Sequence, residues 1–439
     1  MSDQTLPEQA LSEQERIRRE HLAALYEAGI EPYPADEWAV THRAAEILDT
    51  YDDTQHNTEV DGTEPIRVRI AGRMMTKRVM GRASFFHLQD ATGPIQVYVK
   101  RDDLPEGFYN RVFKKLLDTG DFVGVEGTVF RTRMGEVTIE ADAFVLLAKS
   151  LRPLPVVKEQ VDEEGNVRTY NEVTDKEFRY RQRYVDLAVN PDVRTVFRQR
   201  ATLLRTLRDE LDGRGYVEVE TPVLQPLYGG AAARPFTTHH NTLDMPLFLR
   251  IADELYLKRL IVGGFEGVYE IAKNFRNEGL SRFHNPEFTM LELYVAYRDY
   301  AWMMDLAEQL FEAIAVALHG STEVPVTNAD GTTTTLSFAR PWPRRPIFDL
   351  IEEYTGKQLR GPDGQVGDRD ALASAAKELG LDVDASMGAG KLIDEIFGEF
   401  VEPKLIQPTF VTNYPVELSP LAKRHRTEAG LVEHFEGIV

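Results

Sequence analysis

Hydrophobic and polar residues follow two different periods along this chain. Residues 12–28, 193–215 and 300–320 repeat apolar positions at helical spacing, and the first segment opens with Ser12 and Glu15 in a capping-box pattern. Between residues 66 and 148, apolar and polar residues instead alternate in short runs that turn residues separate, which is typical of half-buried strands. The chain therefore combines long helices with a separate strand-rich region.

The strand-rich region has the length of a small closed barrel. About five alternating runs and one helical segment, residues 108–120, fit a Greek-key barrel of the OB type. The proline-rich, charged stretch that follows has no clear period, so we interpret it as a linker. The rest mixes helices and strands, which predicts an α+β domain with a peripheral part at 318–390. The predicted extension, OB-fold barrel, linker and α+β domain cover residues 1–64, 65–152, 153–178 and 179–439.

The charge distribution changes the choice of partners. The formal net charge is −20, which by itself argues against nucleic acid. Residues 66–152 nevertheless carry 15 Lys and Arg against 10 Asp and Glu, a local balance of 15 − 10 = +5. Phosphate attraction acts over about 8 Å in physiological salt, so the local balance counts most. Nucleic acid therefore stays a candidate partner of the barrel.

Composition also narrows the chemistry and the location. The sequence has no cysteine, which excludes disulfides, thiolate nucleophiles and cysteine-ligated zinc. It has no apolar run of about 18 residues and no signal-peptide core at its start. Adjacent His239 and His240 would point to opposite faces of a strand, so we assign no metal ligand. These features predict a cytoplasmic protein without a membrane partner.

The barrel region contains residues suited to binding single-stranded nucleic acid. Phe85 and Phe86 are adjacent on one predicted strand, so alternation places only one of them in the core. An outward aromatic ring on an OB barrel can stack on a base, and the amide of Gln96 can read a base edge. Core filling is the alternative interpretation of the phenylalanine pair. We expect one ring in the core and the other available, with Arg78 close by.

In the second domain, an acid interrupts an otherwise apolar strand. Residues 290–297 alternate, and Glu292 and Tyr294 share one face with apolar neighbours. A carboxylate there is costly unless it meets a cation. Upstream, Gly229 and Gly230 open a loop without bulky side chains, where backbone can approach a ligand. Glu254 begins a helical run, where it is either a helix cap or a ligand-binding acid.

A polar loop precedes this strand and is suited to a polyphosphate. Arg276, Glu278 and His284 bracket it, and arginine makes bidentate, permanently charged contacts to phosphate oxygens. A surface ion pair between Arg276 and Glu278 is the alternative interpretation.

Several stretches together resemble one enzyme family. FRNEG and HNPEFTMLELY resemble motif 2 of the class II aminoacyl-tRNA synthetases, and GYVEVETP resembles their motif 1. The stretches AGRMMTKRVMGRASFFHLQD, GGAAARPF and ELYLKRLIVGGFE are similar to the bacterial lysyl-tRNA synthetase family in particular. The resemblance covers nearly the whole chain. It implies an OB-fold barrel followed by a catalytic domain built on an antiparallel sheet.

The resemblance also implies a role for each stretch. Arg276 would act as the catalytic residue, binding the α-phosphate of ATP and the substrate carboxylate. Glu278, His284 and Phe288 would make the remaining contacts to ATP, and lysine would be bound by Gly230, Glu254, Glu292 and Tyr294. The anticodon would be bound by Phe85, Gln96 and Arg78. Pro222 would lie at the contact with the second subunit. The implied ligands are ATP with Mg²⁺, L-lysine and tRNA(Lys), and the implied assembly is a homodimer.

The family pattern continues after PVELSPLAK with two magnesium-binding carboxylates and the glycine-rich motif 3. This sequence ends at HFEGIV without them, so we expect an incomplete catalytic domain without those metal ligands. The glycines of MGAGK at 387–391 do not match a P-loop and predict a helix start or a turn.

Two functions stay open. One is an ATP-dependent ligase that joins lysine to tRNA(Lys), and the other is a catalytically incomplete relative that only binds tRNA. A ligase that adds lysine to a protein is disfavoured, since such relatives lack the barrel.

Overall fold

This computed structural model describes residues 11–57, 60, 62–155, 158–161, 167–170, 173–281, 283–328, 330–361 and 364–439. The chain forms two compact units, Met1–Val196 and Phe197–Val439. Among the helices in the described ranges, none is both long and apolar enough to cross a membrane.

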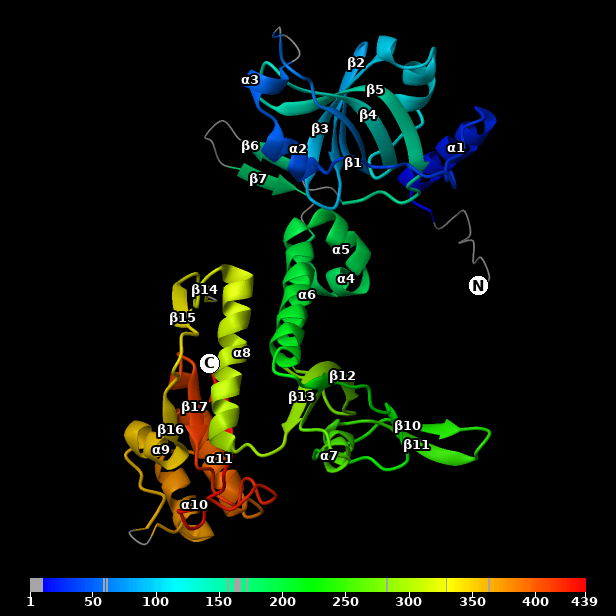
Figure 1. The fold of residues 1–439 in the computed structure, drawn as a ribbon. Coiled ribbons are helices and arrows are strands. Elements are labelled where there is room, and N and C mark those ends of the chain that lie inside the picture. Colours follow the sequence, from blue (N-terminus) through cyan, green and yellow to red (C-terminus); the bar gives the residue numbers. More distant parts are fainter. Residues whose placement is uncertain are drawn as a thin grey trace. The chain divides into compact units, whose positions relative to one another are not determined.

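The first unit is built on a closed barrel with the strand order β1-β2-β3-β5-β4 (Figure 1). Strands β3 and β5 are parallel, and the other neighbours are antiparallel. Buried and partly exposed residues alternate along β2 and β3, as expected for half-buried strands. The OB-fold barrel predicted from the sequence is confirmed. Its strands are β1 (Arg67–Met80), β2 (Ala83–Gln89), β3 (Pro94–Lys100), β4 (Phe122–Arg131) and β5 (Val137–Ala148).

Short helices and a hairpin complete the first unit. The predicted capping box is present, since Ser12 and Glu15 each accept the other's backbone N–H. The helical segment predicted at 108–120 is a π-helical turn whose residues Tyr109 and Phe113 belong to the barrel core. The predicted linker contains an antiparallel hairpin that the sequence pattern did not indicate. These elements are α1 (Glu13–Glu27), α2 (Ala44–Thr50), α3 (Asp53–His56), η2 (Arg101–Asp103), η3 (Tyr109–Phe113), β6 (Lys158–Val161), β7 (Val167–Tyr170), α4 (Lys176–Arg181), α5 (Arg183–Val189) and α6 (Pro191–Asp212), which continues into the second unit.

The second unit contains a sheet of order β13-β12-β8. Strand β8 (Val217–Glu218) pairs in parallel with β12 (Gly267–Phe275) at the edge of this sheet. Strand β13 (Glu287–Val295) pairs antiparallel with β12, which places Glu270 directly opposite Glu292. The strand predicted around Glu292 is therefore confirmed.

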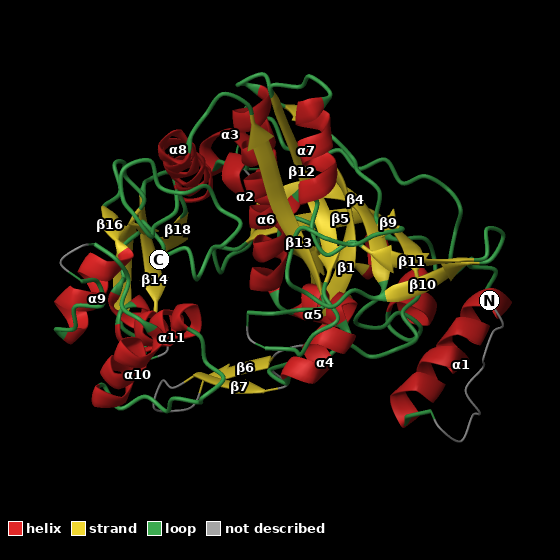
Figure 2. Cartoon of the chain, turned by 90° about the horizontal axis from the view of Figure 1, so that it is seen from below, coloured by secondary structure: helices red, strands yellow, loops and turns green. Residues whose placement is uncertain are grey.

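Helix α7 packs beside β12 and β13 (Figure 2). Helix α8 begins where Asp299 accepts the N–H of Trp302 at 3.1 Å, and it ends at Gly320, whose φ of +70° suits glycine. The same unit also contains a second sheet, of order β10-β11-β9, and a two-stranded hairpin. The bounds are β9 (Leu224–Gln225), β10 (Thr237–His240), β11 (Met245–Leu249), α7 (Glu254–Val262), α8 (Tyr300–His319), β14 (Glu323–Thr327) and β15 (Thr333–Ser337).

The C-terminal part of the second unit has a hydrophobic core of its own, in which Ile347, Ile393 and Val411 are fully buried. Residues 318–390, which the sequence interpretation placed at the periphery, contribute to this core. The helix start predicted at 387–391 is confirmed, since α11 begins after Gly388. The elements are β16 (Arg344–Pro346), α9 (Ile347–Thr355), α10 (Arg369–Glu378), α11 (Ala389–Phe400), η4 (Glu402–Lys404), β17 (Thr409–Thr412) and β18 (Phe435–Ile438).

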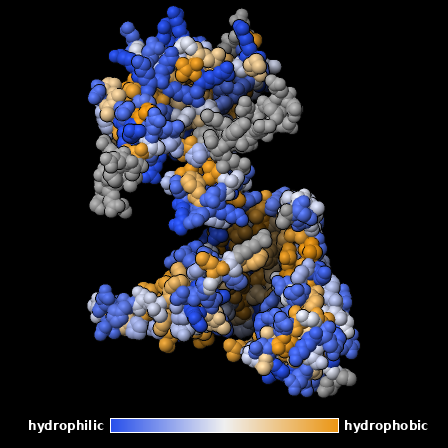
Figure 3. All heavy atoms as spheres, turned by 180° about the vertical axis from the view of Figure 1, so that it is seen from behind, coloured by the Kyte–Doolittle hydropathy of each residue, from blue (hydrophilic) through white to orange (hydrophobic). Residues whose placement is uncertain are grey.

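One face of the second unit carries an open hydrophobic surface. Figure 3 shows hydrophobic residues, in orange, gathered in a hollow of this unit. Strand β13 is only partly buried after Glu287, and its residues Leu291 and Leu293 pack against the core formed by α6 and α8. A strand that is apolar but incompletely covered is typical of a surface that receives a ligand or a partner.

Candidate functional sites

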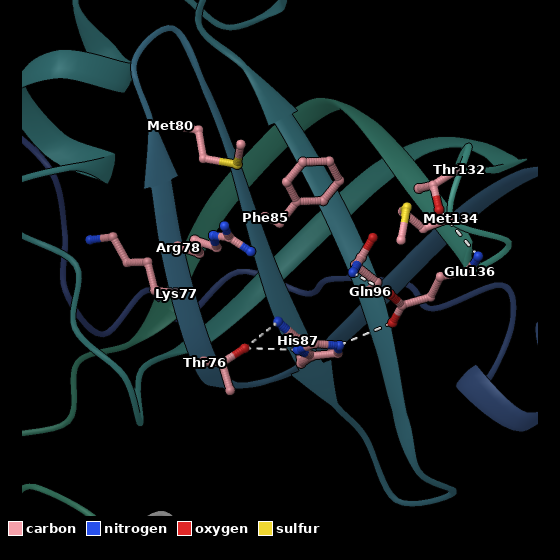
Figure 4. A pocket seen from close by; sticks show the side chains of 10 residues that line it. All are labelled: Thr76, Lys77, Arg78, Met80, Phe85, His87, Gln96, Thr132, Met134 and Glu136. Carbon is pink, nitrogen blue, oxygen red and sulfur yellow. Dashed lines mark hydrogen bonds and ion pairs between the residues drawn. The ribbon is translucent and has the colours of Figure 1, made fainter. Parts of the chain in front are cut away.

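The barrel carries a cavity of about 570 Å³ on the outer face of β1, β2 and β3. It is lined by Phe85, Gln96 and Arg78, which lie on three different strands (Figure 4). Arg78 lies directly opposite Phe85 in the strand register. The structure therefore brings the three predicted anticodon residues together. The full lining is Thr76, Lys77, Arg78, Met80, Phe85, His87, Gln96, Thr132, Met134 and Glu136.

The two adjacent phenylalanines divide as alternation predicts. Phe86 is 1% exposed and belongs to the barrel core. Phe85 faces the cavity and stacks on Tyr98, with ring centroids 4.6 Å apart and an interplanar angle of 28°. Stacking on Tyr98 restricts the orientation of the Phe85 ring, so Phe85 offers a fixed surface on which a planar ligand can stack.

Hydrogen bonds fix the polar side of the same cavity. Gln96 Nε2 donates to Glu136 Oε2 at 2.5 Å, and Thr138 Oγ1 donates to Gln96 Oε1 at 2.9 Å. His87 Nε2 lies 3.1 Å from the other oxygen of Glu136, and its Nδ1 is 2.8 Å from Thr76 Oγ1. The sequence interpretation missed Glu136, because it lies 40 positions from Gln96 and reads as an ordinary surface acid.

In the second unit, the loop between β12 and β13 positions Arg276. Its base is closed by the Arg276 N–H, which donates to the Pro286 carbonyl at 2.8 Å. The Arg276 guanidinium lies 5.1 Å from the centroid of the Phe288 ring and donates from Nε to the Ile251 carbonyl at 3.4 Å. A half-buried guanidinium over an aromatic ring is held ready for an anionic, planar ligand.

Two other predicted phosphate-binding residues lie in the exposed part of this loop. Glu278 is exposed. The structure describes both Glu278 and Arg276, and no ion pair joins them, so the surface-pair interpretation is wrong. His284 is also exposed, and its Nδ1 lies 2.8 Å from Ser281 Oγ. The loop also connects to the glycine-rich segment, since the Asn277 N–H donates to the Arg234 carbonyl at 2.8 Å.

Gly230 and Glu254 lie against each other. Gly230 has a φ of +88°, and a Cβ at this position would come within 3.0 Å of Glu254 Cβ and 3.1 Å of Ala252 Cβ. Only glycine fits both the backbone conformation and the space. Glu254 begins α7 and its Oε1 accepts from Lys258 Nζ at 2.6 Å. The segment from Ile251 to Glu254 thus contacts Arg276 at one end and Gly230 at the other.

Glu292 and Tyr294 adjoin this segment from β13. Glu292 Oε1 is 3.5 Å from the Asp253 N–H, and Tyr294 donates from its hydroxyl to Glu292 Oε2 at 3.4 Å. Burial raises the pKa of the Glu292 carboxyl above its usual value, and the Asp253 carboxylate raises it further. Burial and the same Glu292 charge also raise the pKa of the Tyr294 phenol. No ion pair to Glu292 exists among the residues that the structure describes, so this acid lacks a cation.

Pro222 is exposed beyond the end of β8, where its carbonyl accepts from Gln225 Nε2 at 3.1 Å. Within the described ranges, no three His, Asp or Glu side chains lie close enough together to hold a metal ion.

Comparison with known proteins matches one family model to the barrel and another to the region that follows it. The sequence model described as "OB-fold nucleic acid binding domain" matches residues 68–147, and that described as "tRNA synthetases class II (D, K and N)" matches residues 175–439. A lysine–tRNA ligase of Christiangramia forsetii is 52% identical over 435 residues, which are 98% of this chain and 72% of that protein. A lysine–tRNA ligase of Porphyromonas gingivalis is 49% identical over 433 residues, which are 98% of this chain and 71% of that protein. The chain therefore belongs to the class II tRNA synthetases, within the lysine–tRNA ligase family.

Proposed function

We propose that this protein activates L-lysine with ATP and transfers the lysine to tRNA(Lys). The observation that carries the proposal is Glu292, a half-buried acid without a cation, next to Glu254 and the close-packed Gly230. An acidic, partly desolvated site is suited to the ε-ammonium of lysine, because an opposite charge compensates the burial of the carboxylate. Family membership supports the same reading.

The residues divide the first step between them. The lysine carboxylate would attack the α-phosphorus of ATP, forming the acyl-phosphate bond of lysyl-adenylate while the bond to pyrophosphate breaks. Arg276 would bind both the carboxylate and the α-phosphate, and its fixed position over Phe288 would lower the cost of orienting them. Phe288 would stack on the adenine, and Glu278 and His284 would close over the nucleotide from the exposed loop. ATP would enter as its Mg²⁺ complex, so that the metal arrives as part of the substrate.

The barrel cavity would bind the anticodon of tRNA(Lys). Phe85 would stack on a base while Gln96, oriented by Glu136 and Thr138, would read its edge. Arg78 would contribute charge to the phosphate backbone.

We also infer a cytoplasmic homodimer, in which Pro222 lies at the subunit contact. Val223, Leu224 and Leu227 follow it and are 37%, 49% and 80% exposed, an apolar stretch suited to a second copy. Light scattering of the purified chain measures its mass and tests this assembly.

The decisive experiment is lysine-dependent ATP–pyrophosphate exchange by the full 439-residue chain, without tRNA. We expect exchange that Arg276→Ala lowers by at least about 100-fold, as removal of one transition-state charge does. Arg259→Ala, which removes an exposed arginine from α7 of the same unit, is the matched control and should leave the rate unchanged. Absence of exchange, with tRNA still bound, would instead identify the tRNA-binding relative that lacks catalysis.

A further inference from the structure

Asp253 is a buried carboxylate to which neither the sequence motifs nor the proposed reaction assign a role. It is 0% exposed and stands at the N-cap position of α7, yet its side chain accepts no capping N–H. Its Oδ1 accepts no hydrogen bond from any residue in the described part of the chain. A buried acid is costly unless it is paired, so helix capping does not account for Asp253.

The contacts of Asp253 connect it to the proposed lysine site. Its backbone N–H is directed at Glu292 Oε1, at 3.5 Å, and its Oδ2 accepts from Asn274 Nδ2 at 3.3 Å. Arg250 Nε lies 3.3 Å from Oδ1 but donates its hydrogen to the Lys273 carbonyl at 2.9 Å. Arg250 therefore neutralises Asp253 only by proximity.

Negative charge exceeds positive charge around this carboxylate. Three acids, Asp253, Glu270 and Glu292, lie together, and the guanidinium of Arg250 contacts the first two but not Glu292. Arg250 is the only buried Lys or Arg that the structure describes in the second unit, and it also pairs with Glu270 at 2.7 Å. With the adjoining pair of Glu254 and Lys258 included, four negative charges stand against two positive ones, an excess of 4 − 2 = 2 when all are ionised. Such an excess attracts a cation that the protein itself does not supply.

We propose that Asp253 is a positioning residue that sets the affinity of this site for the ammonium group of the amino acid. Its backbone N–H holds the Glu292 carboxylate in place, and its charge adds to the negative potential that the ammonium meets. Asp253 acts at a distance through the charge of its carboxylate and does not touch the substrate. The inference rests on the proposed function and deepens it, because it adds a residue that determines selectivity for a cationic side chain.

The test is calorimetric titration of the full chain with L-lysine at neutral pH. Asp253→Asn keeps the shape and removes one charge, and we expect it to weaken lysine binding about tenfold, the scale of one charge several ångströms away at intermediate dielectric. Affinity for ATP should stay unchanged. Asp305→Asn is the matched control, since it removes an exposed carboxylate of α8 in the same unit.

The pH dependence distinguishes a charge effect from a structural one. The charged and titratable groups around Glu292 are Asp253 and Glu254 from α7 and its cap, Glu270 from β12 and Tyr294 from β13. Lys258 of α7 pairs with Glu254, and Arg250 pairs with Asp253 and Glu270. Lysine binding requires ionised Glu292, so affinity falls as the pH drops through the pKa of this group. Because the Asp253 charge raises that pKa, Asp253→Asn should move the acid limb to lower pH even while it weakens binding at pH 7.

A double substitution completes the test. In a Glu292→Gln background, Asp253→Asn should weaken lysine binding by a similar further factor, because its charge acts on the ammonium directly. Asp253→Ser, also neutral, repeats the measurements if the asparagine variant does not fold. Equal lysine affinity in Asp253→Asn and Asp305→Asn, an unmoved acid limb, or no lysine binding by the unaltered chain would overturn the inference. Asp253-dependent lysine binding without exchange activity would overturn only the proposed function.

Discussion

The barrel unit and the catalytic unit treat buried charge in opposite ways. In the barrel, the Lys149 side chain is fully buried and its ammonium contacts two carboxylates, Asp118 and Asp121, the second at 2.9 Å. His21 of α1 adds a contact to Asp118 at 2.9 Å. Burial alone would raise the pKa of Asp118, but the hydrogen bonds from His21 and Lys149 lower it below its ordinary value. These charges are balanced by partners within the fold.

In the catalytic unit the balance is missing. Arg250 is shared by Asp253 and Glu270, and Glu292 meets no cation among the described residues. Burial raises the pKa of Asp253 and of Glu292, the opposite direction to Asp118. The difference separates two uses of the same side chains: the acids of the barrel are paired within the fold, whereas Glu292, which we propose binds a ligand, has no ion pair among the described residues. Ligand sites are therefore places where stability is given up for binding.

The largest expected effect is the loss of the balanced charge in the barrel. Lys149→Met leaves two buried carboxylates without their cation, and we expect it to destabilise the barrel by about 3–5 kcal/mol. Hydrogen–deuterium exchange of the barrel strands in increasing urea measures this change apart from the second unit. Lys115→Met, at an exposed position of the same unit, should change stability by less than about 0.5 kcal/mol. An equally stable Lys149→Met variant would contradict the balanced-charge account.

Much of the fold followed from local patterns. The barrel strands and the helices α1 and α8 were predictable, because alternation, caps and glycine stops are local signals. The C-terminal core was not predictable, because its sheet pairs β16 with β17, which are more than sixty residues apart in the sequence. Local hydrophobic periodicity does not predict such a long-range pairing. The hairpin β6–β7 was hidden by the charged, proline-containing stretch around it.

The candidate site was predictable only where a residue contradicted its surroundings. Glu292 was identifiable as an acid on an apolar strand, and it lies beside Asp253 and Tyr294 in the structure. Asp253 was missed, because an aspartate before a helix reads as an ordinary cap. Glu136 was missed for a similar reason, since only the fold brings it to Gln96. Residue type identifies chemistry, but burial and pairing depend on tertiary contacts.

The second-largest expected effect concerns the barrel cavity, where the expected ligand is a nucleic-acid base, in contrast to the cation expected at the acids of the catalytic unit. Phe85→Ala removes the stacking platform, and we expect it to weaken tRNA(Lys) binding about tenfold or more, since base stacking contributes roughly 1–3 kcal/mol. Filter binding at fixed salt measures it. Phe122→Ala, at another partly exposed barrel phenylalanine outside this cavity, is the control. Lysine-dependent exchange without tRNA should be the same in both variants, and a loss of exchange in Phe85→Ala alone would break the assignment of separate roles.

The smallest expected effect tests the unbalanced acids directly. Glu292→Gln should weaken lysine binding strongly but stabilise the ligand-free catalytic unit at neutral pH by roughly 1 kcal/mol, because it removes a half-buried charge that lacks a partner. The folded-state pKa of Glu292 is raised, so the folded chain binds this proton more readily than the unfolded chain does. Its stabilising contribution is therefore present at acidic pH and is lost as the pH rises through the raised pKa.

The advantage of Glu292→Gln over the unaltered chain should accordingly shrink as the pH is lowered toward 4.5, the ordinary value for glutamate. Urea unfolding of the second unit, followed by hydrogen exchange across a pH series, measures this trend. Glu312→Gln, which breaks the 2.6 Å ion pair with Arg340, is the control and should stabilise the unit at no pH. A Glu292→Gln variant less stable than the unaltered chain at pH 7 would mean that this acid already has a structural partner, and the contrast with the paired acids of the barrel would then disappear.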